Sequence, residues 1–174
     1  MKVLQRIADA LHVLAQVVAG GALGVIAIIT LMQIYFRFIL NDSLVWSVEL
    51  GTFLNIWVGF IGAIVVMRNW QHTNIPTFVN MISTPMRYYI MTAVKLVPLG
   101  FVLYLAVKGV DYIQGPLHFT SPAMGFNTRW VKIAVPVSGV VMTFFCILII
   151  IEDIIAIRRR DSDHFDNQGN VGIE

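Results

Sequence analysis

The sequence predicts an all-α membrane protein with four transmembrane helices, and three observations lead to this fold class. Residues 10–36, 50–67 and 133–151 carry no charged side chain, and residues 88–107 carry only Lys95. Crossing a hydrocarbon core of about 30 Å takes roughly 20 helical residues at ~1.5 Å each. Hydrophobic residues make up 57% of the chain and charged residues 13%, and the mean hydropathy is +0.77. Because backbone amides in lipid must be satisfied within the segment, each stretch must be a helix.

The predicted membrane domain takes in residues 1–160, and its spans cover residues 13–36, 48–68, 88–108 and 131–152. Lys2 and Arg6 precede the first span as they would in a signal peptide. Its uncharged run is far longer than the ~7–15-residue core of such a peptide, so we expect a retained span. The polar residues 161–174 are expected to form a disordered tail.

Four spans place both termini on the same side of the membrane, and the distribution of Lys and Arg residues indicates which side it is. With cytoplasmic termini, the inside holds Lys2, Arg6, Arg68, Arg87, Arg158, Arg159 and Arg160, and the outside holds Arg37, Lys108, Arg129 and Lys132. Since Lys and Arg concentrate on the cytoplasmic side, we expect both termini to be cytoplasmic.

Two further segments have the apolar spacing of amphipathic helices. Leu4, Ile7 and Leu11 recur at helical spacing before the first span, as do Ile75 and Ile82 between the second and third spans. We expect both segments to lie in the membrane interface. The alternative for the first is a plain continuation of span one.

Glu49 and Arg68 bracket the second span, one near each edge of the hydrocarbon core. Each is expected near the helix end whose dipole favours its charge. In one interpretation Glu49 binds a coupling ion or a proton. In the other, both residues position the helix and pair with a neighbour. This interpretation needs no functional explanation, because a charge at the membrane edge costs little free energy.

Lys95 lies about 10 Å inside the third span on the cytoplasmic side. This depth is too far from Glu49 for a direct pair. Lys95 either extends to the cytoplasmic headgroups or meets an acceptor on another helix or another subunit. The sequence shows no polar cluster inside the spans.

Small residues spaced four apart predict close helix contacts, either within the chain or with another protein. They are Gly20 with Gly24, and Gly59 with Ala63. The outer loop, residues 111–130, is rich in glycine and proline, so no regular element is expected there. Its aromatic side chains are expected at headgroup depth or against a partner.

The sequence contains no motif that indicates an enzyme, a redox protein or a nucleic-acid-binding protein. No two histidines share a helix face, which argues against a haem or zinc site and a membrane redox subunit, and no phosphate loop or nucleophile–base pair is present. The single cysteine, Cys146, cannot form an intrachain disulfide. The net charge of +2 is spread over the chain, so we expect no nucleic-acid partner. We expect no catalytic residue, metal or cofactor.

Two motifs carry a family resemblance. The first runs Trp46-Ser-Val-Glu49-Leu50, then Trp57, Gly62-Ala63, Arg68 and His72; the second runs Ser121-Pro-Ala-Met-Gly125, Trp130 and Ile133-Ala-Val-Pro136-Val-Ser-Gly139. Together they resemble the small membrane subunit, DctQ-like, of TRAP (tripartite ATP-independent periplasmic) transporters. The chain departs from the family pattern at Val48, Thr52 and Pro76, where the family often has Glu, Arg and Asp.

The resemblance implies an accessory subunit in a bacterial inner membrane. Such a subunit binds a large multi-span subunit, which carries the substrate and sodium sites and moves like an elevator, while a periplasmic binding protein delivers an organic acid, such as sialic acid or a C4-dicarboxylate. The architectural or subunit-contact residues would be Trp46, Glu49, Trp57, Gly59, Gly62, Ala63, Arg68, His72 and Lys95. The loop facing the binding protein would include Ser121, Pro122, Gly125, Phe126, Arg129 and Trp130.

The rival hypothesis is a self-contained homo-oligomeric exporter or channel that uses Glu49 as a proton-coupled site. It predicts an activity for this protein alone that Glu49→Gln abolishes. The accessory-subunit hypothesis predicts no such activity, because a chain without a polar cluster inside the membrane is poorly equipped to transport alone.

Overall fold

The computed structural model describes residues 2–69, 90, 92–115 and 120–159. Its helices are α1 (Lys2–Phe38), α2 (Val45–Asn69), α5 (Leu96–Gln114), α6 (Arg129–Lys132) and α7 (Ala134–Arg159). Within these residues, four helical stretches are long and apolar enough to cross a membrane: Val3–Phe38, Val45–Arg68, Thr92–Gln114 and Arg129–Arg158. The all-α, four-span fold class is confirmed. The cytoplasmic orientation of the termini stays a prediction.

Helix α1 is continuous over 37 residues, or about 55 Å at the α-helical rise. The amphipathic segment before the first span is therefore the beginning of the same helix, which is the alternative that the sequence left open. This length exceeds a hydrocarbon core of about 30 Å, so part of α1 must extend beyond the core or tilt. The second amphipathic segment, residues 75–85, lies outside the described residues.

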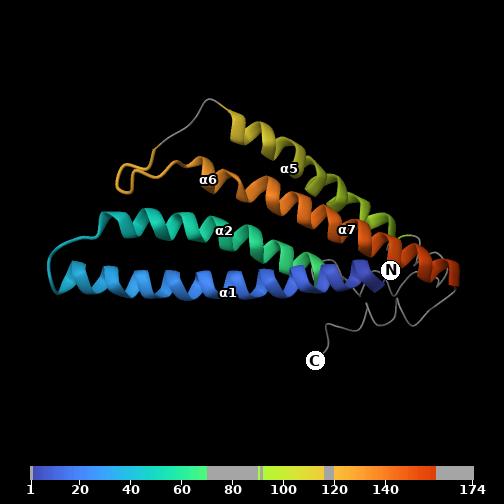
Figure 1. Cartoon of the computed structure of the whole chain (residues 1–174), viewed down its shortest axis with the longest axis horizontal. Coiled ribbons are helices and arrows are strands. Elements are labelled where there is room, and N and C mark those ends of the chain that lie inside the picture. The colour runs from blue at the N-terminus through green and yellow to red at the C-terminus, as the bar shows by residue number, and fades with distance from the viewer. Residues whose placement is uncertain (1, 70–89, 91, 116–119, 160–174) are drawn as a thin grey trace.

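A short turn makes α1 and α2 antiparallel neighbours (Figure 1). Asn41 adopts a φ of 52°, a left-handed conformation that asparagine tolerates better than most residues. The backbone N–H of Asp42 donates to the carbonyl of Phe36 at 3.1 Å. The Ser47 hydroxyl donates to the carbonyl of Leu44 at 2.6 Å, at the beginning of α2.

Helices α5 and α7 form the second antiparallel pair, and glycine allows their backbones to approach closely. A Cβ atom on Gly139 would lie 2.7 Å from the backbone nitrogen of Ala106. One on Gly109 would lie 2.9 Å from the backbone nitrogen of Pro136. By contrast, a Cβ on Gly20, Gly24 or Gly59 would meet nothing within 4 Å. The glycines singled out by their spacing of four residues are thus not the ones that the chain uses for its own closest helix contact.

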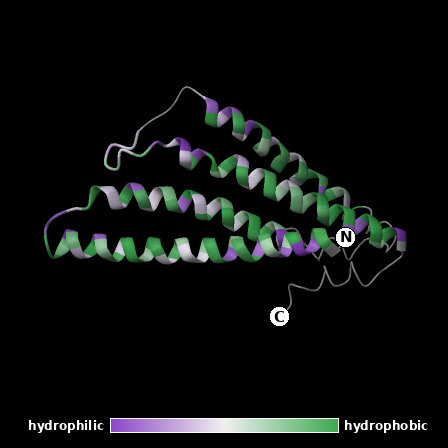
Figure 2. Ribbon diagram, in the orientation of Figure 1, coloured by the Kyte–Doolittle hydropathy of each residue, from purple (hydrophilic) through white to green (hydrophobic). Residues whose placement is uncertain are grey.

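Helix α7 packs against both α2 and α5 and contributes most of the core. Its Phe145 and Cys146 are fully buried, and Met142 and Leu148 are nearly so. The helices are apolar over most of their surfaces, with polar residues gathered near their ends (Figure 2). This pattern is the one expected for helices whose outer faces meet lipid.

The two helix pairs lie close together at one end of the molecule and spread apart toward the other (Figure 1). We call the first the terminal end, because it holds the beginning of α1 and the end of α7. The second is the loop end, which holds the α1–α2 turn and residues 120–128. The polar contacts described below lie at these two ends of the molecule.

Candidate functional site

At the loop end, the carboxylate of Glu49 on α2 holds the loop that precedes α6. It accepts hydrogen bonds from the Ser121 hydroxyl and from the backbone N–H groups of Ala123 and Met124, the latter two at 3.2 Å. We call these four residues the Glu49 cluster. Because bonds to a charged acceptor are stronger than neutral ones, this single side chain ties α2 to the loop.

The loop is shaped so that its N–H groups converge on that carboxylate. Gly125 N–H donates to the carbonyl of Ser121 at 2.9 Å, and Ser121 N–H donates to the carbonyl of Phe126 at 2.8 Å. Gly125 has a φ of 63°, which glycine adopts without strain. A tight turn of this kind directs successive backbone N–H groups toward one anion.

An aromatic contact adds to the attachment one turn further along α2. The rings of Phe53 and Phe126 lie 6.0 Å apart between centroids. Ser121 is 5% exposed, whereas Trp130 is 60% exposed. The loop is therefore anchored on its inner side and presents apolar side chains on its outer side.

At the terminal end, Lys95 and Asp153 form a buried ion pair. Lys95 Nζ lies 2.5 Å from Asp153 Oδ2, and the two side chains are 1% and 0% exposed. The Thr92 hydroxyl makes a longer contact of 3.5 Å with the same oxygen. We call these three residues the Lys95 cluster. It joins the beginning of the third span to the fourth span.

Two further contacts at this end join α1 to its neighbours. Arg68 pairs with Asp9 at 2.7 Å, and Gln5 Nε2 donates to Glu152 at 3.1 Å. The Asp9 side chain is 65% exposed, and exposed ion pairs contribute little stability. The buried Lys95–Asp153 pair therefore dominates the electrostatics of the terminal end.

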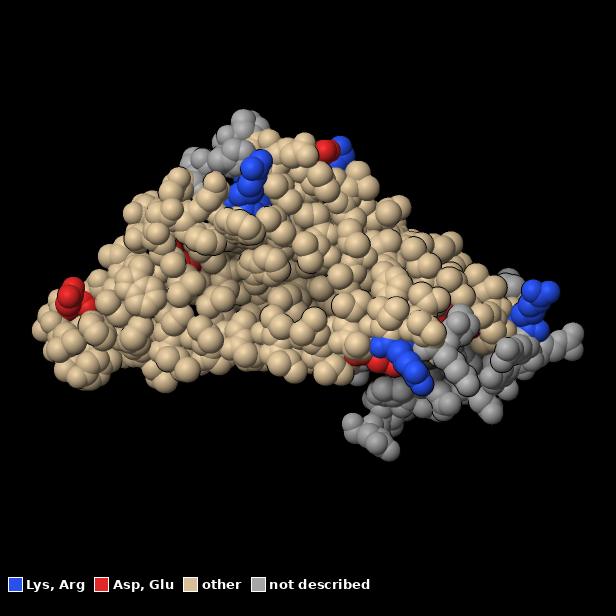
Figure 3. Space-filling model, viewed as in Figure 1, with Lys and Arg blue, Asp and Glu red and all other residues tan. Residues whose placement is uncertain are grey.

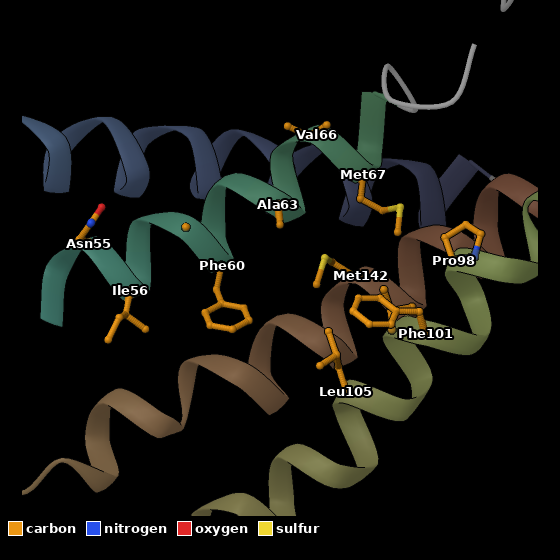
Figure 4. Close-up of a pocket in the computed structure, with 12 residues that line it drawn as sticks. Asn55, Ile56, Phe60, Ala63, Val66, Met67, Pro98, Phe101, Leu105 and Met142 are labelled. Atoms are coloured by element: carbon orange, nitrogen blue, oxygen red, sulfur yellow. The ribbon is translucent and has the colours of Figure 1, made fainter. Parts of the chain in front are cut away.

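Between the ends, an apolar groove of about 700 Å³ runs between α2 and α5, with Met142 of α7 at its base (Figure 4). Its α2 side includes Asn55, Gly59 and Ala63. A hollow of about 540 Å³ continues it to Lys108 and Lys132 at the loop end. Figure 3 shows that most of the visible surface between the two ends lacks charged side chains.

The structure brings together many of the predicted residues. Glu49 meets Ser121, Pro122 lies beside them, and Phe126 reaches the same place through Phe53. Thr52, one of the departures from the family pattern, donates to the Val48 carbonyl at 2.9 Å within its own helix. Other predicted residues lie apart from both clusters: Trp46 is 37% exposed, Trp57 and Gly62 are half-buried, and Arg129 and Trp130 are exposed. His72 lies outside the described residues.

Asp153 is the functional residue that the sequence analysis missed. Asp153 lies one residue beyond the predicted end of the fourth span at residue 152, yet it is fully buried. The expectation of no polar cluster inside the spans was therefore wrong. Of the two alternatives for Lys95, the structure shows the acceptor on another helix. A buried lysine requires a counter-charge. A search for an acid near the cytoplasmic end of the fourth span, level with Lys95 in the third span, could have found Asp153.

The Glu49 dipole argument also needs correction. Helix α2 begins at Val45, and its first turn contains no acidic residue. Glu49 therefore lies just beyond the turn in which the helix dipole acts strongly. The loop donors, rather than the beginning of the helix, provide the contacts of its carboxylate.

Among the described residues, no group of three or more His, Cys, Asp or Glu could hold a metal ion.

Comparison with known proteins decides the family. The family model of the DctQ component of tripartite ATP-independent periplasmic transporters matches residues 26–156. The chain belongs to the DctQ family. A DctQ protein is a transporter subunit and not an enzyme, and this one is a multi-pass protein of the bacterial inner membrane.

The chain is also similar to three proteins that are named as TRAP transporter permease proteins. The chain is 26% identical over 144 residues to the sialic acid TRAP transporter small permease protein SiaQ of Vibrio cholerae, covering 83% of this chain and 82% of that protein. It is 22% identical to a putative TRAP transporter small permease protein of Haemophilus influenzae, covering 83% and 89%. It is 26% identical to the sialic acid TRAP transporter permease protein SiaT of Haemophilus influenzae, covering 67% of this chain but 19% of that protein.

Proposed function

We propose that this DctQ protein is the scaffold subunit of a sodium-coupled TRAP importer for an organic acid of the sialic acid or C4-dicarboxylate class. It binds a large membrane subunit, which carries the substrate and sodium sites, and the assembly receives its solute from a periplasmic binding protein. Both termini are cytoplasmic in this proposal, and the loop end faces the periplasm.

The observation that carries the proposal is the use of the charged side chains for structural contacts. The Glu49 oxygens accept bonds from the chain's own loop, and Lys95 is paired with Asp153. Groups engaged in this way hold helices together and do not form a path for a solute. The names of the SiaQ and SiaT relatives support the organic-acid class.

The anchored loop supports a docking role for the periplasmic binding protein. Met124 and Phe126 are 38% and 41% exposed, although Glu49 fixes the backbone beside them. A rigid loop that presents apolar side chains to water loses little conformational entropy when a soluble partner binds. Met124 takes part in the Glu49 cluster only through its backbone N–H, so a change of its side chain keeps that hydrogen bond.

The rival exporter or channel would require Glu49 to release and rebind a proton during transport. Its carboxylate already accepts hydrogen bonds from three donors of the chain's own loop. Glu49 therefore fits a structural role better than a coupling role.

The deciding experiment is purification of the tagged protein from its native membrane, followed by mass spectrometry and reconstitution into vesicles. We expect a large membrane protein in stoichiometric amount. We also expect solute uptake that requires a sodium gradient, the binding protein and both membrane subunits. A Met124→Ser variant should keep the membrane complex but lower uptake. A homo-oligomer that transports alone would contradict the proposal.

A further inference from the structure

Asn55 places a polar amide inside the second span, at the surface of the apolar groove. It lies six residues beyond Glu49, which puts it about 9 Å deeper along α2. The residue is exposed, and within the described part of the chain its side chain has no hydrogen-bond partner. Lipid tails offer no hydrogen bonds, so this amide requires a partner from another molecule.

The same stripe of α2 is open to close backbone approach. Gly59 and Ala63 follow Asn55 at successive intervals of four residues, which places all three on one helix face. A Cβ atom on Gly59 would meet nothing within 4 Å, whereas Gly109 and Gly139 are already filled by the α5–α7 contact. The Asn55–Gly59–Ala63 stripe therefore has the composition of a helix contact, and no helix among the described residues fills the space beside Gly59.

The residues that line the groove beside this stripe indicate which kind of molecule it can bind. No charged residue lines it, and Ile56 and Phe60 point from α2 into the space that Phe101 and Leu105 of α5 also line (Figure 4). An acyl chain would fit the apolar sides but would leave the Asn55 amide unsatisfied. A transmembrane helix with one hydrogen-bonding side chain would satisfy both.

We propose that a transmembrane helix of the large subunit packs along this groove, with its backbone against Gly59 and Ala63 and a polar side chain bonded to Asn55. The proposal rests on the proposed function, because the large subunit supplies the helix. A relative supports a membrane partner of this kind. The stretch that is similar to this chain makes up 19% of SiaT of Haemophilus influenzae, so in that permease protein it is part of one longer polypeptide.

The first test measures how much large subunit copurifies with each variant of this chain. Gly59→Leu should lower the ratio of large to small subunit by about tenfold or more, because the added side chain occupies the helix contact. Asn55→Leu should lower it less. The matched control is Gly20→Leu on α1, where a Cβ also meets nothing within 4 Å. An unchanged ratio for Gly59→Leu, or an equal loss for Gly20→Leu, would overturn the proposal.

A second measurement covers a variant that fails to fold. A photoreactive phenylalanine analogue is introduced at Ile56 in the groove or at Val25 on the exposed surface of α1. In native membranes, irradiation should link the Ile56 variant to the large subunit and leave the Val25 variant unlinked. If the Ile56 variant links only to lipid, the groove is a lipid site and the proposal is wrong. If wild-type protein brings no large subunit at all, the proposed function itself fails.

Discussion

At the scale of single residues, two carboxylates determine how the spans are joined. Asp153 neutralises a lysine that would otherwise be buried alone, and Glu49 gathers donors from a loop more than 70 residues away in sequence. Neither contact joins residues that are neighbours along the chain. Removing either partner leaves a polar group with lost bonds in a region of low dielectric, where that loss is most costly.

Breaking the Lys95–Asp153 pair should destabilise the protein strongly. Lys95→Met or Asp153→Leu alone leaves an uncompensated buried charge, at a cost of about 3–5 kcal/mol. The double variant removes both charges and should recover most of that loss. Thermal unfolding in detergent measures the three variants, with Lys108→Met in an exposed pair as the control. Additive losses in the double variant would contradict the pairing.

Glu49→Gln should release the loop without unfolding the spans. The amide keeps one acceptor oxygen but loses its charge, which weakens bonds worth about 1.5–3 kcal/mol each. Hydrogen exchange at the amides of Ala123 and Met124 should accelerate by roughly tenfold or more. Asp42→Asn, an exposed acid at the same end, is the matched control and should leave the exchange unchanged. A proton flux by the isolated wild-type protein that Glu49→Gln abolishes would favour the rival function instead.

At the scale of helices, the α5–α7 contact is specified by glycines that belong to no small-residue spacing within one helix. Gly109 and Gly139 lie on different helices, so no small-residue spacing within one helix reveals them. Gly20, Gly24 and Gly59 have the familiar spacing, yet their faces are open. A short-range motif indicates that a helix can be approached closely, and only the packing shows whether its own chain does so.

Gly139→Ala should therefore destabilise the protein, whereas Gly59→Ala should not. The new Cβ at position 139 would lie 2.7 Å from a backbone nitrogen of α5, so the helices must separate, at a cost of about 1–3 kcal/mol. At position 59 the same methyl group meets nothing within 4 Å. The unfolding temperatures of both variants of the isolated subunit provide the comparison. Equal effects at the two positions would mean that α5 and α7 do not pack as described.

At the scale of the whole molecule, the two helix pairs meet at the terminal end and diverge toward the loop end, where the Glu49 cluster bridges part of the gap (Figure 1). The arrangement leaves a broad apolar surface and the apolar groove between α2 and α5. A protein of this shape is suited to a fixed position in a larger membrane assembly, because its outer faces are built for lipid or for other helices.

The orientation of the molecule can be tested with single cysteines. Met124→Cys on the loop and Val3→Cys on α1 are both at exposed positions, and the native Cys146 is fully buried. In intact cells with a permeable outer membrane, a membrane-impermeant maleimide should label Met124→Cys. It should label Val3→Cys only after the inner membrane is opened. The reverse pattern would place the termini in the periplasm and overturn the positive-inside prediction.

The sequence by itself determined the four apolar spans and the identity of most polar residues that matter, because hydropathy and charge are properties of the residues. The tertiary structure alone decided which of them meet. Glu49 and the Ser121 loop were both marked as candidates, but their contact joins distant segments. Asp153 fell outside the predicted fourth span, because a boundary drawn from hydropathy takes no account of a charge that its partner Lys95 neutralises. Pairing in space changes the cost of burying a charge, and the linear sequence does not contain that pairing.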